Sequence, residues 1–365
     1  MTRPAGKDES QLRILVLPDT NPTKIKKEGQ KWAFFRYWPE GSYEFDWMGA
    51  YQVPLWSRWV EGKLIGSFLT QSVRAVWKES SYDVVIAHGS RSIIGLALLH
   101  RLLGRRKPKL VVFDIEGFGR PRSGWKLWVV RQAVEALDTV VYHARPQEGY
   151  YSAYLPRLEG KTHFIPLGIG MSTEPFRWEE IGKGEFILSL DTTAPRRREW
   201  EVLIRAYRRL PDPPRLRIIG KTRWSGEELG EEDPPAGIEL VPRMPAAELR
   251  KLMQQCRLAV LPFLERGHAH GQLSLLELMA AGAPVVVSDT AGVRDYVRHG
   301  ETALLYSSGN SDQLAERIQW ALEHPSERRA LGRRAREAVK ERFSGERFSQ
   351  RIYELIAGLT SESVP

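Results

Sequence analysis

The stretch at residues 267–306 constrains the fold most, because a glycine-bearing loop, an apolar helix and a buried strand follow one another directly. The loop occupies 267–271, and leucines follow at helical spacing until Gly282, a residue that typically ends a helix. Residues 285–287 form an uninterrupted apolar run, which is typical of a parallel strand buried on both faces. The order loop, helix, strand predicts one unit of a parallel α/β sheet.

Glu277 lies within this helix among apolar neighbours, and a carboxylate near a core needs a partner or must stay outside the core. At helical spacing its neighbours are small, namely Ser274, Ala280 and Ala281, which leaves space for a ligand with hydroxyl groups. The loop also feeds a helix N-terminus, whose free N–H groups and positive dipole end suit a phosphate. Together these features predict a nucleotide-diphosphate site. The alternative is that Glu277 is an ordinary helix-surface residue.

Strands and helices alternate along the rest of the chain. Apolar runs predict strands at 12–17, 84–87, 110–113, 139–142, 162–165, 186–190, 216–219, 239–241 and 258–261. Residues 58–77 carry apolar side chains at helical spacing, whereas 20–51 is expected to be one long connection. We therefore expect an α/β protein with two Rossmann-like doubly wound domains that face a central cleft. Expected boundaries are 1–178, 179–345 and, for a C-terminal helix that packs back on the first domain, 346–365.

Composition supports two domains of a globular protein. The chain has 365 residues, more than one hydrophobic core usually organises. A single cysteine, Cys256, excludes an internal disulfide and is expected in the core. Without a signal peptide or a run of about 18 apolar residues, we expect a cytoplasmic protein. The net charge of +9 favours anionic partners without selecting one class.

Tryptophans are mixed with basic residues in the first half of the chain. Trp125, Lys126, Trp128 and Arg131, with the basic run 105–107, indicate a peripheral contact with the inner face of the plasma membrane. The alternative interpretation is that Trp125 and Trp128 are core residues of a Rossmann helix.

Three arginines at 196–198 precede a predicted helix. Positive charge at a helix N-terminus opposes the helix dipole unless an anion binds there, and arginine suits bidentate capture of phosphate. The cluster therefore predicts a phosphate site, and the alternative is a solvated run of charges.

Residues 258–310 resemble the signature region of glycosyltransferase family 4. The segment LSLLELMAAGAPVV at 273–286 fits the family pattern almost residue for residue, and 291–305 fits it more loosely. The resemblance implies the GT-B fold, with an acceptor-side first domain and a donor-binding second domain. It implies a retaining transfer of a sugar from a UDP- or GDP-linked donor to an acceptor hydroxyl, in cell-envelope polysaccharide or glycolipid synthesis. Cofactor, metal and nucleic acid are not expected, and the acceptor would be a saccharide or lipid-linked saccharide.

The resemblance also assigns residues by position. Glu277 matches the glutamate that holds the donor ribose, and Arg198 falls where the family has its phosphate-binding lysine. The family arginine a few residues earlier aligns with Thr193, and Arg196 or Arg197 is its expected substitute. The remaining donor-binding candidates are the nucleobase loop and the helix start with the loop before it: Arg243, Met244, His270, Gly271, Gln272, Leu273, Ser274 and Leu275.

Two positions depart from the family pattern. Ala269 stands where a glutamate usually faces the donor sugar, so that the neighbouring histidines or Gln272 serve the sugar or the donor differs. Glu116 stands where the family often has a histidine at the end of a strand. We take Glu116 and His88 as catalytic candidates in the cleft. The alternative for Glu116 is pairing with Arg120 or Arg122.

Other functions fit the same residues. A sugar-nucleotide epimerase shares this architecture and would need no acceptor. A catalytically degenerate nucleotide-binding module is favoured by Ala269 and would show no turnover. Nucleic-acid binding is the weakest alternative, because the basic residues are scattered and no recognition motif is present.

Overall fold

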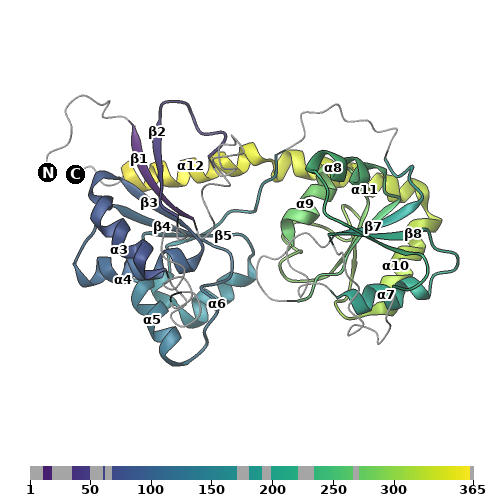
Figure 1. Ribbon diagram of the computed structural model, residues 1–365, viewed down its shortest axis with the longest axis horizontal. Coiled ribbons are helices and arrows are strands. Elements are labelled where there is room, and N and C mark those ends of the chain that lie inside the picture. Colours follow the sequence, from purple (N-terminus) through teal and green to yellow (C-terminus); the bar gives the residue numbers. More distant parts are fainter. Residues whose placement is uncertain are drawn as a thin grey trace. The chain divides into compact units, whose positions relative to one another are not determined.

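The computed structural model describes residues 11–18, 35–49, 61, 68–170, 181–190, 199–220, 234–265 and 271–361. The chain forms two compact units (Figure 1), one of Met1–Pro166 with Phe348–Pro365 and one of Leu167–Arg347. In the described part, each unit contains one parallel sheet of six strands, so the predicted α/β fold with two Rossmann-like sheets is confirmed.

The first sheet has the strand order β2-β1-β3-β4-β5-β6, and all its neighbours pair in parallel. The strands are β1 (Leu12–Pro18), β2 (Tyr43–Trp47), β3 (Val84–His88), β4 (Lys109–Asp114), β5 (Thr139–Tyr142) and β6 (Thr162–Phe164). The expectation that 20–51 is a connection without a strand is wrong, because β2 lies within it as an edge strand beside β1.

Four helices cover one face of this sheet, and they share a buried apolar cluster with its strands. They are α3 (Leu69–Lys78), α4 (Ile94–Leu102), α5 (Gly124–Val134) and α6 (Pro146–Tyr154), with short 3-10 turns at Glu79–Ser81, Ser90–Ser92 and Pro156–Leu158. The apolar side chains of α3 do not all face this core, because Val73 and Trp77 are exposed while Gln71 and Ser72 are buried.

The last helix, α12 (Gly345–Ser361), packs against the first unit (Figure 1). The Trp38 indole Nε1 donates a hydrogen bond to the Ser349 carbonyl oxygen at 3.0 Å, and its ring meets Tyr353 edge-on with centroids 5.2 Å apart. Phe348 lies beside the His143 ring, 5.9 Å between centroids. Residues 348–361 therefore complete the packing of a unit whose other described parts all precede residue 167.

The second sheet has the strand order β12-β11-β10-β7-β8-β9, again all parallel. Its strands are β7 (Phe186–Leu190), β8 (Arg215–Ile219), β9 (Ile238–Val241), β10 (Leu258–Leu261), β11 (Val285–Ser288) and β12 (Leu304–Tyr306). One face packs on α8 (Ala246–Gln255), α9 (Gln272–Ala280) and α11 (Pro325–Arg342), the other on α7 (Trp200–Arg208) and α10 (Ser311–Glu323). Cys256 is fully buried here, as predicted, and burial raises the pKa of its thiol to about 12.

Candidate functional site

The predicted loop, helix and strand of residues 267–306 are present as the approach to α9, α9 itself and β11. Gly271 is the N-cap of α9 in a left-handed conformation with φ of 76°. A Cβ atom at this position would lie 2.3 Å from the Phe263 ring, so that only glycine fits. The Leu275 N–H bonds the Gly271 carbonyl at 3.1 Å and closes the first turn. The first N–H groups of an α-helix lack the carbonyl acceptor one turn earlier, and a helix N-terminus is therefore suited to an anion.

Glu277 is half-buried on α9, and its carboxylate makes no hydrogen bond or ion pair to another described residue. Burial raises the pKa of Glu277, while the charge of Arg250 on the neighbouring α8 lowers it. A partly desolvated carboxylate without a partner is costly, and ligand hydroxyls would offset that cost.

The other candidates on α9 differ in accessibility. Gln272 is almost fully buried, and its Nε2 donates to the Gly292 carbonyl at 3.0 Å, so its amide holds the loop after β11. Ser274 is also buried, as is the Leu275 side chain. Leu273 is exposed. A ligand would therefore contact this turn through the backbone of Leu273 and Ser274.

Arg243 and Met244 directly follow β9, at the carboxyl edge of the second sheet where open parallel sheets bind ligands. Arg243 is exposed, whereas Met244 packs against the core cluster under α8 and α9. The remaining donor-site candidates Arg197, Arg198 and His270 lie outside the described residues, as does Ala269.

In the first unit, His88 and Glu116 lie at the carboxyl ends of neighbouring strands. His88 is the last residue of β3 and is paired with Phe113 of β4, and Glu116 is an exposed residue of the loop that follows β4. The Gly89 N–H bonds the Phe113 carbonyl at 3.0 Å and holds the two strand ends together. The structure thus brings both catalytic candidates to one edge.

Asp114 is a buried acid at this edge that the sequence analysis did not single out. It ends β4, and its carboxylate accepts hydrogen bonds from the Phe118 N–H at 3.0 and 3.1 Å and from the Tyr151 hydroxyl at 2.8 Å. Gln147 Nε2 donates to the Asp114 carbonyl at 2.9 Å and to the Tyr151 hydroxyl at 3.0 Å. The sequence pattern that could have pointed to Asp114 is an acidic residue directly after a buried apolar run.

The loop that carries Glu116 folds around this carboxylate. Residues 117–120 all have positive φ, between 52° and 71°, and two of them, Phe118 and Arg120, are not glycine. A backbone with positive φ at residues other than glycine is costly and is stable only where surrounding contacts hold it. Here the hydrogen bond from the Phe118 N–H to the Asp114 carboxylate holds the loop. The presentation of Glu116 therefore depends on Asp114.

Burial raises the pKa of Asp114 to about 6, although the hydrogen bonds from Phe118 and Tyr151 lower it. Nearby, burial lowers the pKa of His143 to about 4, partly offset by the hydrogen bond to the Ile165 carbonyl. Between pH 4 and 6 the two groups act in opposite directions, because folding binds a proton at Asp114 and releases one at His143.

We expect the Asp114 contribution to stability to be fully present below about pH 4 and lost as the pH rises to about 6, a change of about 3 kcal/mol. Asp114→Asn removes this titration but leaves that of His143. Urea unfolding at about pH 4 and about pH 7 should therefore show a change in unfolding free energy that is about 3 kcal/mol more negative for the wild type than for the variant. Equal pH dependence in both proteins would show that Asp114 does not titrate in this range.

In the described part of the chain, no helix is long and apolar enough to cross a membrane, and no group of three or more His, Cys, Asp or Glu side chains could hold a metal ion.

Solved structures share this fold. Sucrose-phosphate synthase from Thermosynechococcus elongatus superposes with a TM-score of 0.73 at 17% identity over 97% of this chain and 100% of that one. HepE of Anabaena, solved in complex with UDP-glucose, gives a TM-score of 0.70 at 16% identity over 95% and 100%. The two parallel sheets are thus those of the GT-B glycosyltransferases.

Residues 171–338 match the family described as Glycosyl transferases group 1. EpsD of Bacillus subtilis, which is described as a glycosyltransferase, is 27% identical over 285 residues that cover 72% of this chain and 73% of that protein. The match identifies a group 1 glycosyltransferase domain at 171–338, so that the predicted resemblance to family 4 and the prediction of an enzyme are both confirmed.

Proposed function

We propose that this enzyme is a retaining glycosyltransferase that moves a hexose from a UDP- or GDP-linked donor to an acceptor hydroxyl, in the synthesis of cell-envelope polysaccharide or glycolipid. The observation that carries the proposal is α9, which combines a left-handed glycine at its N-terminus with the half-buried carboxylate of Glu277, which makes no hydrogen bond or ion pair to a described residue. The first suits a diphosphate and the second suits a ribose.

The donor is held by groups at the carboxyl edge of the second sheet. The N–H groups of Leu273 and Ser274 receive the diphosphate, Glu277 accepts hydrogen bonds from the ribose hydroxyls, and the backbone of Arg243 and Met244 contacts the base. Arg197 and Arg198 add positive charge, and His270 serves the sugar, whereas Gln272 holds the loop after β11. A helix N-terminus and arginines stabilise the leaving diphosphate without a metal ion.

UDP-glucose is the first donor to test, because HepE was solved with it. On the acceptor side, Glu116 and His88 orient the acceptor hydroxyl or stabilise positive charge that develops on the sugar. The acceptor is a saccharide or a lipid-linked saccharide, and the enzyme works in the cytoplasm at the inner face of the plasma membrane.

Glu277→Ala should weaken UDP or GDP binding about 10- to 150-fold, because a hydrogen bond to a charged group is worth about 1.5 to 3 kcal/mol. Isothermal titration calorimetry with each nucleotide measures the loss. The matched control is Glu316→Ala, which removes an exposed glutamate from α10 on the opposite face of the sheet. Unchanged affinity in folded Glu277→Ala would remove the ribose role.

Product analysis with donor alone separates the competing functions. A retaining transferase should release sugar slowly from the donor, and with an acceptor it should form a product that keeps the anomeric configuration. An epimerised nucleotide sugar would identify an epimerase instead. Nucleotide binding without any turnover, across a panel of UDP- and GDP-sugars, would indicate a degenerate module.

A further inference from the structure

Three adjacent helices of the first unit expose apolar side chains on their outer surface. Trp77 is 83% exposed, Leu102 80%, Trp128 63% and Trp125 58%. In the described part of the chain, the large exposed apolar side chains number ten, and seven belong to this layer: Leu69, Val73, Trp77, Leu102, Leu103, Trp125 and Trp128. The interpretation of Trp125 and Trp128 as core residues is therefore wrong.

The three helices lie side by side, since α3 contacts α4 and α4 contacts α5. Hydrogen bonds join their C-terminal ends. Arg105 Nη1, just after α4, donates to the Val76 carbonyl of α3 at 3.0 Å, and Arg101 Nη1 of α4 donates to the Gln132 carbonyl of α5 at 3.3 Å. The exposed side chains thus belong to three neighbouring helices, with Trp125 and Trp128 at the start of α5 and Leu102 and Leu103 at the end of α4.

Helix α3 carries its apolar side chains on its exposed side, as a helix does when an apolar environment lies on that side. Leu69, Val73 and Trp77 are spaced four residues apart and are exposed, while Gln71 and Ser72 are fully buried. A helix at a protein surface normally shows the reverse pattern. This surface is therefore better suited to contact with an apolar environment than with water.

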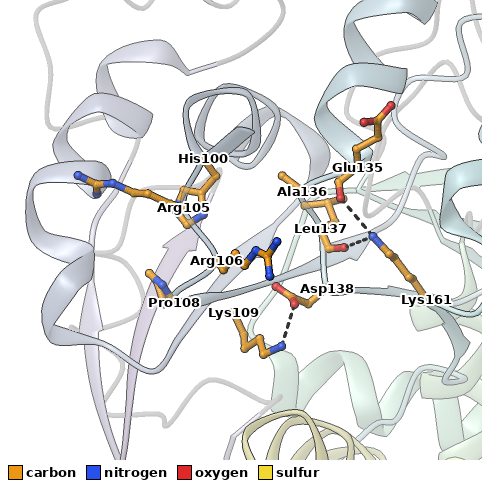
Figure 2. Close-up of a pocket in the computed structure, with 10 residues that line it drawn as sticks. All are labelled: His100, Arg105, Arg106, Pro108, Lys109, Glu135, Ala136, Leu137, Asp138 and Lys161. Carbon is orange, nitrogen blue, oxygen red and sulfur yellow. Dashed lines mark hydrogen bonds and ion pairs between the residues drawn. The ribbon is translucent and has the colours of Figure 1, made fainter. Parts of the chain in front are cut away.

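Positive charge borders the same surface. Where α4 ends, the chain reads Arg105, Arg106 and Lys107, and a pocket of about 330 Å³ opens at the amino edge of the sheet (Figure 2). Six cations, Arg101, Arg105, Arg106, Lys107, Lys109 and Lys161, border or line this region against the three carboxylates Glu79, Glu135 and Asp138. Three positive charges are left without a neutralising carboxylate.

Most of these groups are engaged. Arg105 pairs with Glu79 at 2.5 Å, Lys109 with Asp138 at 3.1 Å, and Lys161 Nζ donates to two backbone carbonyls. Arg106 lines the pocket but makes no hydrogen bond or ion pair to another described residue, and no dashed line reaches it in Figure 2. Its guanidinium is available to an anion from outside, and guanidinium binds phosphate well.

We propose that this surface, defined as the α3–α5 face and comprising the seven exposed apolar side chains with Arg106 and Lys107, docks on an anionic lipid bilayer. The Trp and Leu side chains enter the headgroup region, and the amino-edge pocket receives a lipid phosphate through Arg106. Tryptophans beside basic residues are suited to this boundary, where one part of each side chain meets apolar and one part polar surroundings. The inference specifies the membrane contact of the proposed function but does not depend on the donor site.

Charge complementarity selects a bilayer as the occupant. An apolar protein partner would not account for the three surplus charges, and a soluble anion would not account for the exposed leucines and tryptophans. An anionic membrane satisfies both, since it offers phosphates at its surface and apolar chains beneath them.

The test is flotation of the full chain with vesicles of equal parts phosphatidylcholine and phosphatidylglycerol, and with phosphatidylcholine vesicles. We expect binding to the anionic vesicles that weakens with salt. Arg106→Glu with Lys107→Glu should lower the partition coefficient at least about 30-fold, because each basic residue near such a surface contributes about fivefold. Leu102→Ser with Leu103→Ser should also weaken binding, with the residual binding more sensitive to salt.

The matched control is Arg329→Glu with Arg333→Glu on α11, which makes the same change in net charge on exposed positions of the second unit. It should leave the partition coefficient within about twofold. An equal loss in the control, no binding to anionic vesicles, or unchanged binding of the Arg106, Lys107 variant would each overturn the proposal. UDP and GDP titrations of the same variants separate the two sites, because loss of vesicle binding should leave nucleotide affinity unchanged.

Discussion

Glu116→Gln should lower turnover about 10²-fold or more while leaving donor affinity nearly unchanged. The substitution keeps the shape of the side chain and removes its charge. Glu116 lies one loop beyond the end of β4, and Asp114 fixes the backbone of that loop through the Phe118 N–H. If the carboxylate orients the acceptor or stabilises charge on the sugar, its loss affects the reaction and not the binding of the nucleotide.

The measurement is the initial rate at saturating donor and acceptor, with nucleotide affinity determined by calorimetry. Glu159→Gln is the control, because Glu159 is an exposed glutamate of the same unit in the turn before β6. Turnover within a few-fold of the wild type would exclude Glu116 from the chemistry and favour its pairing with Arg120 or Arg122.

Gly271→Ala should destabilise the enzyme by about 2 to 5 kcal/mol and weaken nucleotide binding. Left-handed backbone costs a residue with a Cβ about 1 to 2 kcal/mol, and overpacking adds about 1 to 3 kcal/mol. The added Cβ would lie 2.3 Å from the Phe263 ring, so either that ring or the start of α9 must move. Urea unfolding and UDP titration measure the two effects.

Gly300→Ala separates the two contributions. Gly300 also has a left-handed conformation, with φ of 74°, but a Cβ there meets nothing within 4 Å. The destabilisation caused by Gly300→Ala should therefore equal the backbone cost alone. If Gly271→Ala costs no more than Gly300→Ala, the Phe263 ring gives way freely and does not fix the N-terminus of α9.

Uninterrupted apolar runs predicted the central strands well, because a parallel strand buried on both faces has no polar positions to obscure it. Edge strands lack that signal. In β2, Glu44 and Asp46 alternate with aromatic residues, and the strand lies inside a polar segment, so the sequence favoured a connection. The strand β12 and the helix α6 were also not predicted. The strand β12 is very short and flanked by loops, and α6 is a short helix rich in tyrosine.

At the site, the sequence predicted what depends on local order: a glycine before a helix and a glutamate among small neighbours on it. It did not predict Asp114, whose importance arises from Tyr151 and Gln147, residues more than thirty positions away that meet it only in the folded sheet. Helix α3 shows a similar limit, because apolar spacing indicates a helix but not which side faces the core.

The position of α12 has a consequence for the order in which the protein can mature on the ribosome. The first unit includes Phe348–Pro365, and the Trp38 indole donates its hydrogen bond to the Ser349 carbonyl. During synthesis, the N-terminal half therefore emerges with one side of its packing incomplete, while the second unit, Leu167–Arg347, is already continuous. The part of the chain made first is thus the part finished last, and a nascent chain stalled before residue 348 would present the bare surface around Trp38 to chaperones.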